Sequence, residues 1–142
     1  YRLGGLQAAL GNSQLKNMKK TISQKIEQGN YYNELFKDYL DILQIPELSY
    51  KGSANHYWVY GIVLNKQDVR DKLINELMNQ GIETRPFFHP LHLQDALPKK
   101  FSNNLKLPIS ENIGKNGLYL PLGNHLKKSD QNFIVKTLLN SI

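Results

Sequence analysis

The chain has 142 residues, the size of one ordinary domain, and its hydrophobic content of 40% supports a modest core rather than a disordered tail. It contains no cysteine, which excludes disulfides, thiolate nucleophiles and cysteine-ligated zinc or iron–sulfur sites and is consistent with a cytoplasmic protein. The net charge of +6 rests on dispersed lysines, a pattern that favours a solvated cationic surface over a nucleic-acid footprint.

No stretch of the sequence approaches the roughly 18 to 20 apolar residues of a membrane span, so we expect no association with a membrane. The chain opens on Tyr1-Arg2-Leu3 without a charged and then apolar leader, so we expect no secretory signal. It also opens without a methionine, and we therefore expect it to be a piece of a longer protein.

The first part of the chain, residues 4–43, predicts two helices with a break near residues 12–17. Gly29 weakens the middle of the second helix, and Pro46 ends it. The apolar positions at helical spacing are Leu6, Ala9 and Leu10 in the first helix, and Ile22, Ile26, Phe36, Leu40 and Leu43 in the second.

The rest of the chain predicts strands that alternate with helices. Residues 56–64 form the best strand, because they are β-branched and aromatic and are apolar on both faces. Pro86 cannot donate to a ladder, so the second strand lies at an edge of the sheet or ends there. The predicted order is strand 56–64, helix 69–78 with Asn65 as N-cap and Gly81 after its end, strand 82–88, loop 93–107, helix 110–117 capped by Ser110, strand 118–121, and a final helix capped by Ser129.

This order predicts an α+β fold, in which helices cover a small three-stranded sheet that is mixed or antiparallel. We divide the chain into a helical segment, residues 1–45, and an α+β domain, residues 46–142. The predicted N-terminal helices are longer than is needed to cover so small a sheet. We therefore expect the helical segment to contact a partner or a domain outside this chain.

The most informative segment is 81–92, with the sequence Gly-Ile-Glu-Thr-Arg-Pro-Phe-Phe-His-Pro-Leu-His. A buried strand rarely needs an arginine and two histidines beside a pair of phenylalanines, whereas a cleft that binds a polar, ring-shaped ligand does. A metal site is disfavoured, because Pro90 imposes an extended path and neither a cysteine nor a clear acidic third ligand is near. The candidate binding residues are Arg85, Phe87, Phe88, His89 and His92.

The start of the chain resembles the sequence signature of a known protein family. Tyr1-Arg2-Leu3, followed by Leu6-Gln-Ala-Ala-Leu-Gly11 and Gln14-Leu15, resembles the signature N-x-R-(M/L)-x-x-x-Q-A-A-(I/L)-G-x-x-Q-L of the DegT/DnrJ/EryC1/StrS aminotransferases, which use pyridoxal phosphate to aminate sugars. Gly4-Gly5 departs from that family, in which a polar pair is common. Segments that follow in the family order are His56-Tyr-Trp-Val-Tyr60, Arg70, Leu73, Leu77, Gly81-Ile82, Pro90-Leu-His92 and Leu120-Pro-Leu122.

The block Glu83-Thr-Arg-Pro-Phe-Phe88 resembles more specifically the perosamine-synthase branch, whose members aminate GDP-4-keto-6-deoxymannose. The resemblance covers essentially the whole chain and implies the C-terminal small domain of a fold-type I pyridoxal-phosphate transferase. In the family the Schiff-base lysine, the aspartate that pairs with the pyridinium nitrogen and the residue that stacks on the cofactor lie in an N-terminal domain. None of those motifs is present in this sequence.

The resemblance implies a full-length parent that is a homodimer. It would transfer an amino group from glutamate to a nucleotide-linked 4-keto-6-deoxy sugar, in polysaccharide biosynthesis. This chain would orient the substrate and close the cleft, and by itself it is expected to be inactive and to bind no cofactor.

Each candidate residue has a functional and a structural interpretation. In the functional interpretation the guanidinium of Arg85 binds a diphosphate through bidentate hydrogen bonds, and in the structural one it pairs with an acidic neighbour. Phe87 and Phe88 alternate faces on a strand, so one is expected in the core while the other stacks on a guanine or a sugar. His89 and His92 hydrogen-bond a sugar hydroxyl or loop carbonyls.

Arg2 lies in the best-matching motif, which in the family is near the dimer interface and the edge of the cofactor; its structural alternative is solvation at the start of a helix. Tyr57, Trp58 and Tyr60 are interpreted as core aromatics rather than as a ligand platform.

Two other functions stay open. A basic binding module for nucleic acid or an acidic partner would explain the charge and the interspersed aromatics, and it predicts steeply salt-dependent binding; the lack of a clustered basic face counts against it. The other is a regulatory relative that keeps the fold without catalysis.

Overall fold

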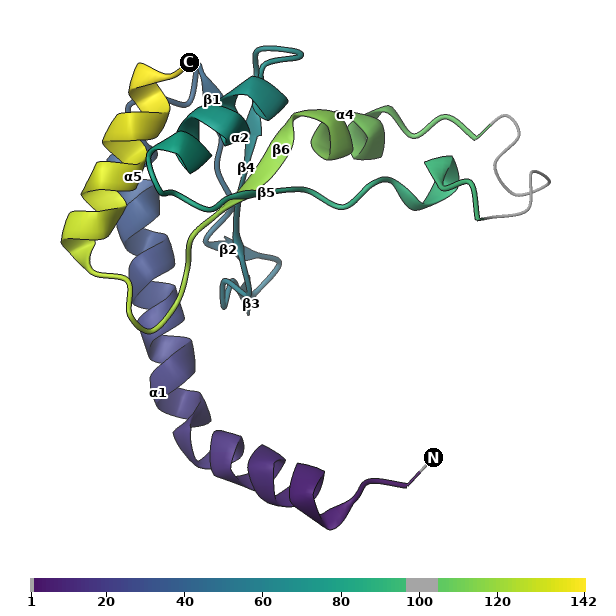
Figure 1. Cartoon of the computed structure of the whole chain (residues 1–142), viewed down its shortest axis with the longest axis vertical. Helices are drawn as coiled ribbons and strands as arrows, with labels where there is room; N and C mark the ends of the chain where they lie inside the picture. The colour runs from purple at the N-terminus through teal and green to yellow at the C-terminus, as the bar shows by residue number, and fades with distance from the viewer. Residues whose placement is uncertain (1, 97–104) are drawn as a thin grey trace.

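The computed structural model describes residues 2–96 and 105–142, and it has the α+β fold that the sequence predicts. None of the described helices combines the length and the apolar character that a bilayer span requires. The elements in chain order are α1 (Gly5–Phe36), β1 (Leu43–Gln44), β2 (Ser49–Tyr50), β3 (Ser53–Ala54), β4 (Tyr60–Leu64), α2 (Arg70–Asn79), β5 (Arg85–Pro86), the 3₁₀ turn η1 (Leu91–Leu93), α4 (Pro108–Asn116), β6 (Gly117–Leu120) and α5 (Lys128–Asn140) (Figure 1).

The main sheet has four antiparallel strands in the order β1-β4-β6-β5, while β2 and β3 form a separate hairpin. The sequence predicts three strands, and the fourth is β1, which pairs Leu43 with Leu64. A strand of two residues leaves no alternation to recognise, so no sequence pattern reveals it. As Pro86 predicts, β5 lies at an edge of the sheet.

One face of the sheet carries the core. Figure 1 shows α1, α2 and α5 gathered on one side of the strands. Alternate residues of β4 and β6 are buried in the same cluster as apolar residues of these helices. The cluster contains Tyr32 and Phe36 of α1, Leu73 and Leu77 of α2, Ile134, Val135 and Leu138 of α5, and Tyr60, Ile62, Leu64, Leu118 and Leu120 of the sheet.

The first helix is continuous over 32 residues, so the predicted break near residues 12–17 is wrong. The polar residues of that stretch are exposed, where each costs a helix only about 0.5 kcal/mol relative to alanine. The helix also ends well before Pro46, because the chain turns after Phe36, whose carbonyl accepts a hydrogen bond from the Tyr39 N–H (2.9 Å). Gly29 does not interrupt it.

The end of α2 is as predicted and its start is not. Gly81 follows the helix in the left-handed conformation (φ 75°), and its N–H donates to the Met78 carbonyl at 2.9 Å. Asn65 does not cap α2. Its side-chain amide donates to the Asp41 carbonyl (2.9 Å) and so fixes the turn before β1.

The predicted serine caps of the last two helices are also wrong. α4 begins at Pro108, whose fixed φ suits the first position of a helix, so Ser110 lies inside it. α5 begins at Lys128, and the carboxylate of Asp130 accepts a hydrogen bond from the Lys127 N–H (2.9 Å). Ser129 therefore lies inside this helix as well.

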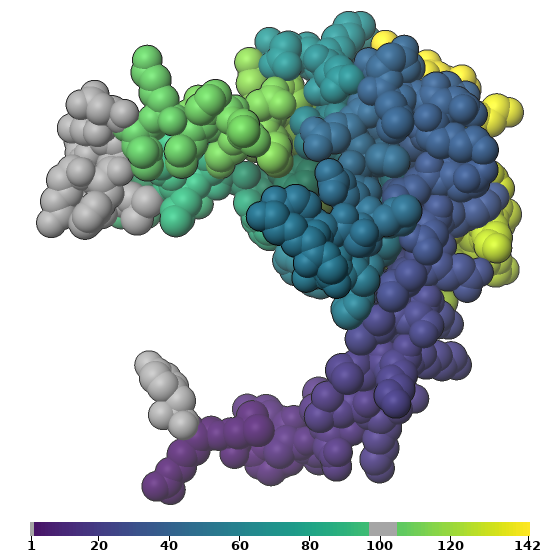
Figure 2. All heavy atoms as spheres, turned by 180° about the vertical axis from the view of Figure 1, so that it is seen from behind, coloured from purple at the N-terminus to yellow at the C-terminus, as the bar shows by residue number. Residues whose placement is uncertain are grey.

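An arm leaves the sheet between β5 and β6; we use this name for residues 87–96 and 105–116. Its two limbs are joined by His92 and Glu111, whose Nε2 and Oε1 atoms lie 3.0 Å apart. Figure 1 shows the arm extending away from the side on which α5 lies. Figure 2 shows the molecule as an open C, with the arm and the start of α1 as its two ends. The predicted loop 93–107 lies in part outside the described residues.

Candidate functional site

The second face of the sheet is not covered by α1, α2 or α5, and it carries Arg85. Residues directly opposite each other in an antiparallel pair share a face. Arg85 is opposite Tyr119, and Tyr119 is opposite Gly61 on the other side. These residues alternate with Ile62 and Leu118, which are buried in the core, so they lie on the face away from the helices. We call this the open face.

Phe87 joins the arm to the open face. Its ring packs on two glycines so closely that a Cβ added to Gly61 would lie 2.3 Å from the ring, and one added to Gly117 would lie 2.1 Å from it. The ring centroids of Phe87 and Tyr119 are 4.6 Å apart. Phe87 is half-buried and Phe88 is exposed. Both rings pack against Tyr119 after β5 has ended, and neither belongs to the core cluster, so the expectation that one of the pair lies in the core is wrong.

An aromatic cluster lies beside Phe87. The rings of Trp58 and Phe88 are nearly parallel, 18° apart, with centroids separated by 6.3 Å, and 73% and 67% of their surfaces are exposed. The ring of Tyr119 meets Phe88 edge-on at 5.8 Å. Tyr57 and Tyr60 are core residues as predicted, but the placement of Trp58 in the core is wrong.

The exposure of Trp58 comes from the residue before it. In an unbroken strand from residue 56, Trp58 would share the buried face of Tyr60 and Ile62. Instead, Tyr57 has a left-handed backbone (φ 48°), and the strand begins only at Tyr60. The ring of Tyr57 then enters the core against Gly29, where a Cβ would lie 2.5 Å from it, and the next side chain points outward.

Arg85 is exposed on the open face. Its guanidinium donates to the Glu83 carboxylate at 2.8 Å, and both side chains are largely in solvent. An exposed ion pair of this kind contributes about 0 to 1 kcal/mol, so breaking it costs little free energy. The structural and the functional interpretations of Arg85 are therefore compatible.

The two histidines lie in the arm. His89 is exposed, with Nε2 3.2 Å from the Leu93 carbonyl. His92 is buried and its Nε2 contacts Glu111. The same carboxylate oxygen accepts a hydrogen bond from the Leu107 N–H (3.0 Å). The hydrogen bond from His92, and after it the one from Leu107, holds the pKa of the Glu111 carboxyl below its ordinary value.

The structure does not bring Arg2 to these residues. It is exposed and precedes α1, at the end of the C opposite the arm (Figure 1). Among residues 2–96 and 105–142, no group of three or more histidine, aspartate or glutamate side chains converges in a way that would hold a metal ion.

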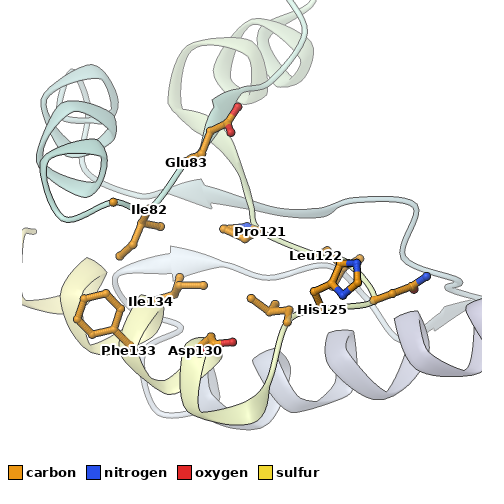
Figure 3. A pocket seen from close by; sticks show the side chains of 12 residues that line it. Ile82, Glu83, Pro121, Leu122, His125, Asp130, Phe133 and Ile134 are labelled. Carbon is orange, nitrogen blue, oxygen red and sulfur yellow. The ribbon is translucent and has the colours of Figure 1, made fainter.

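Several hollows mark the surface formed by the described residues, and two of them are larger than 500 Å³. One, of about 530 Å³, lies at the root of the arm between Phe87, Phe88 and the first turns of α4. The other, of about 620 Å³, lies between the end of α2, the loop after β6 and α5, and Figure 3 shows Glu83, His125, Asp130 and Phe133 around it. Of the acidic residues that line the second hollow, Glu83 binds Arg85 and Asp130 accepts a hydrogen bond from the Lys127 N–H.

Residues 1–139 match the family described as the DegT/DnrJ/EryC1/StrS aminotransferases. The chain belongs to this family. It is 33% identical over 121 residues to a GDP-perosamine synthase of Escherichia coli O157:H7, covering 85% of this chain and 31% of that protein. It is 28% identical over 140 residues to the GDP-perosamine synthase of Caulobacter vibrioides, covering 97% of this chain and 37% of that protein.

Solved structures show the same fold. The chain superposes on Helicobacter pylori PseC, an aminotransferase of pseudoaminic acid biosynthesis, with a TM-score of 0.83 at 23% identity, over 99% of this chain and 38% of that one. The structure of S. venezuelae DesV in complex with a ketimine intermediate gives a TM-score of 0.85 at 20% identity, over 98% of this chain and 36% of that one. The chain thus spans about a third of the length of its relatives.

The described residues do not by themselves form a site for pyridoxal phosphate, the cofactor of this family. A Schiff-base lysine must lie in a pocket with an anchor for the phosphate beside it. The described lysines other than Lys25 are exposed. The ammonium group of Lys25 donates to the carbonyl of Trp58 (3.0 Å) and is held at the surface of α1.

Proposed function

We propose that this chain is the C-terminal, substrate-orienting domain of a pyridoxal-phosphate-dependent aminotransferase. The full-length enzyme would move an amino group from glutamate to C4 of a nucleotide-linked 4-keto-6-deoxy sugar, most closely as in GDP-perosamine formation, and release 2-oxoglutarate. The main support is the family match over residues 1–139 together with the identity to GDP-perosamine synthases.

When bound to the missing N-terminal lobe, the cofactor supplies the electron sink for amino transfer. The residues of this chain would bind and orient the sugar nucleotide. Arg85 offers the guanidinium for its diphosphate, and Phe88 offers a ring face. His89 in the arm is exposed and able to reach a sugar hydroxyl, while His92 would hold the arm in shape through Glu111.

The shape of the domain supports a role in closing the cleft. The start of α1 and the arm form the two ends of an open C (Figure 2), and both carry exposed apolar residues that a second lobe or a second subunit would cover. We propose a homodimer in the cytoplasm, where nucleotide sugars and glutamate are found, with Arg2 near the edge of the cofactor.

The test uses the full-length protein. Loaded with pyridoxal phosphate, it should show the cofactor's absorbance band near the visible edge. Glutamate should bleach this band, and a 4-keto-6-deoxy sugar nucleotide should restore it. The 142-residue chain alone should show no such band. A full-length protein whose band responds to neither substrate would contradict the proposed activity and favour a regulatory relative.

A further inference from the structure

The backbone at Tyr57 is held in an unfavourable conformation by several independent contacts. A left-handed backbone at a bulky residue costs on the order of 1–3 kcal/mol and persists only where the surroundings impose it. The Tyr57 N–H donates to the Asn55 side chain (2.8 Å), and its hydroxyl accepts a hydrogen bond from Asn33 (3.2 Å). Lys25 of α1 binds the carbonyl that follows.

Because of this strained turn, the indole ring of Trp58 is exposed. A relaxed strand would bury Trp58, and the fold instead exposes 73% of it. A single exposed ring is common, but exposed apolar rings that lie together, as Trp58 and Phe88 do, mark a site of interaction. Because the turn is fixed from α1, the ring is positioned before any ligand arrives.

The surroundings of Trp58 indicate which ligand. Phe88 is nearly parallel to it, and Tyr119 supports Phe88 from the edge, so flat ring faces are grouped at one place. Arg85 is the cross-strand neighbour of Tyr119 on the same face. A flat aromatic surface next to an exposed guanidinium is complementary to a molecule with a planar base at one end and a diphosphate at the other.

We propose that Trp58 and Phe88, supported by Tyr119, form a stacking platform for the nucleobase of a nucleoside diphosphate, whose phosphates bind Arg85. The inference rests on the proposed function, because it names the part of the sugar nucleotide that this face would bind. It adds Trp58 and Tyr119 to the binding residues and assigns the base, rather than the sugar, to Phe88.

The experiment measures binding to the full-length protein by titration calorimetry, with GDP and inorganic diphosphate as separate probes. Trp58→Ala should raise the Kd of GDP by about tenfold, as expected for the loss of one stacked base, and leave the Kd of inorganic diphosphate unchanged. Trp58→Phe, which keeps a ring, should stay within about threefold of wild type. Arg85→Ala should raise the Kd of both probes.

Phe133→Ala is the matched control, because Phe133 is an exposed ring on α5, away from the open face, and it should leave both Kd values unchanged. Should Trp58→Ala fail to fold, Phe88→Ala gives the same test from the other ring.

Three outcomes would overturn the platform: wild-type protein that does not bind GDP, a Trp58→Ala variant that binds GDP as wild type does, or an equal loss of GDP and inorganic diphosphate binding in that variant. The second outcome would indicate that the upstream lobe or a second copy covers the rings, and the third that Trp58 acts on the phosphate contacts and not on the base. These readouts are separate from the cofactor band, so failure of amino transfer and failure of the platform are distinguishable. Where both hold, Trp58→Ala should raise KM for the sugar nucleotide and leave kcat unchanged.

Discussion

Gly29 is a position where helix propensity and packing act in opposite directions. Replacing a glycine inside a helix by alanine favours the helix by about 1 kcal/mol. At Gly29, however, the new Cβ would lie 2.5 Å from the ring of Tyr57, which is buried and fixed at both ends. Overpacking of this kind costs about 1–3 kcal/mol. The net effect is the difference of these two contributions, so we expect Gly29→Ala to lower the free energy of unfolding by up to about 2 kcal/mol.

The same helix contains the control. Gly11 is exposed, and a Cβ there would meet nothing within 4 Å, so Gly11→Ala should raise the free energy of unfolding by up to about 1 kcal/mol. Urea denaturation of the 142-residue chain measures both variants. Equal stabilities for the two would show that the ring of Tyr57 does not rest on Gly29.

The packing of Tyr57 on Gly29 also explains why the sequence does not reveal that Trp58 is exposed. The run from His56 to Leu64 reads as one continuous strand, because its residues are almost all apolar or aromatic. A period of two from residue 56 then assigns Trp58 to the core. The only local hint of the turn is Asn55, a residue that often hydrogen-bonds the backbone two positions later, as it does here.

At the scale of elements, the periodic segments were predictable and the short ones were not. Helix α2 with its terminal glycine and the strand β6 follow from local pattern. The strand β1 and the ends of α1 depend on pairing and turns between distant segments, which local pattern does not report. Arg85 and the two phenylalanines were predictable as candidates, but their grouping with Tyr119 needed the register of β5 and β6.

The arm provides a prediction at this scale, through the contact of Glu111 with His92 and Leu107. The folded pKa of this carboxyl lies below its ordinary value. The ionised carboxylate therefore stabilises the arm fully at pH values above the ordinary pKa, and this contribution is lost as pH falls through the lowered value. We expect the hydrogen-exchange protection of the Leu107 N–H to fall between about pH 5 and pH 3.

Glu111→Gln removes the titration and keeps the size of the side chain. In this variant the protection of the Leu107 N–H should be weaker than in wild type at pH 5 and should not change toward pH 3. The amide of Ile62, in the central strand β4, serves as the internal reference for global unfolding. A wild-type protection that is flat over this range would mean that the carboxylate does not hold the arm.

At the scale of the whole molecule, the first half of α1 contributes no residue to the core of this chain. All described residues up to position 20 are exposed, and five of them are large and apolar. Figure 2 shows this part of the helix standing clear of the domain. In the proposed enzyme it packs on the upstream lobe or on a second subunit. The five residues are Leu3, Leu6, Leu10, Leu15 and Met18.

One double variant, placed in two contexts, tests that arrangement. Leu6 and Leu10 lie one turn apart on the same side of α1 and are 85% and 63% exposed. In the 142-residue chain, Leu6→Glu with Leu10→Glu should change the free energy of unfolding by less than about 0.5 kcal/mol, as is usual for surface substitutions. In the full-length protein the same change should cost about 1.5–3 kcal/mol for each leucine that the second lobe buries, and should lower the melting temperature.

Leu48→Glu, at an exposed site near the β2–β3 hairpin, should be neutral in both proteins. If the double variant were equally neutral in the full-length protein, α1 would remain in solvent there, and this chain would not be the closing half of a two-lobed enzyme.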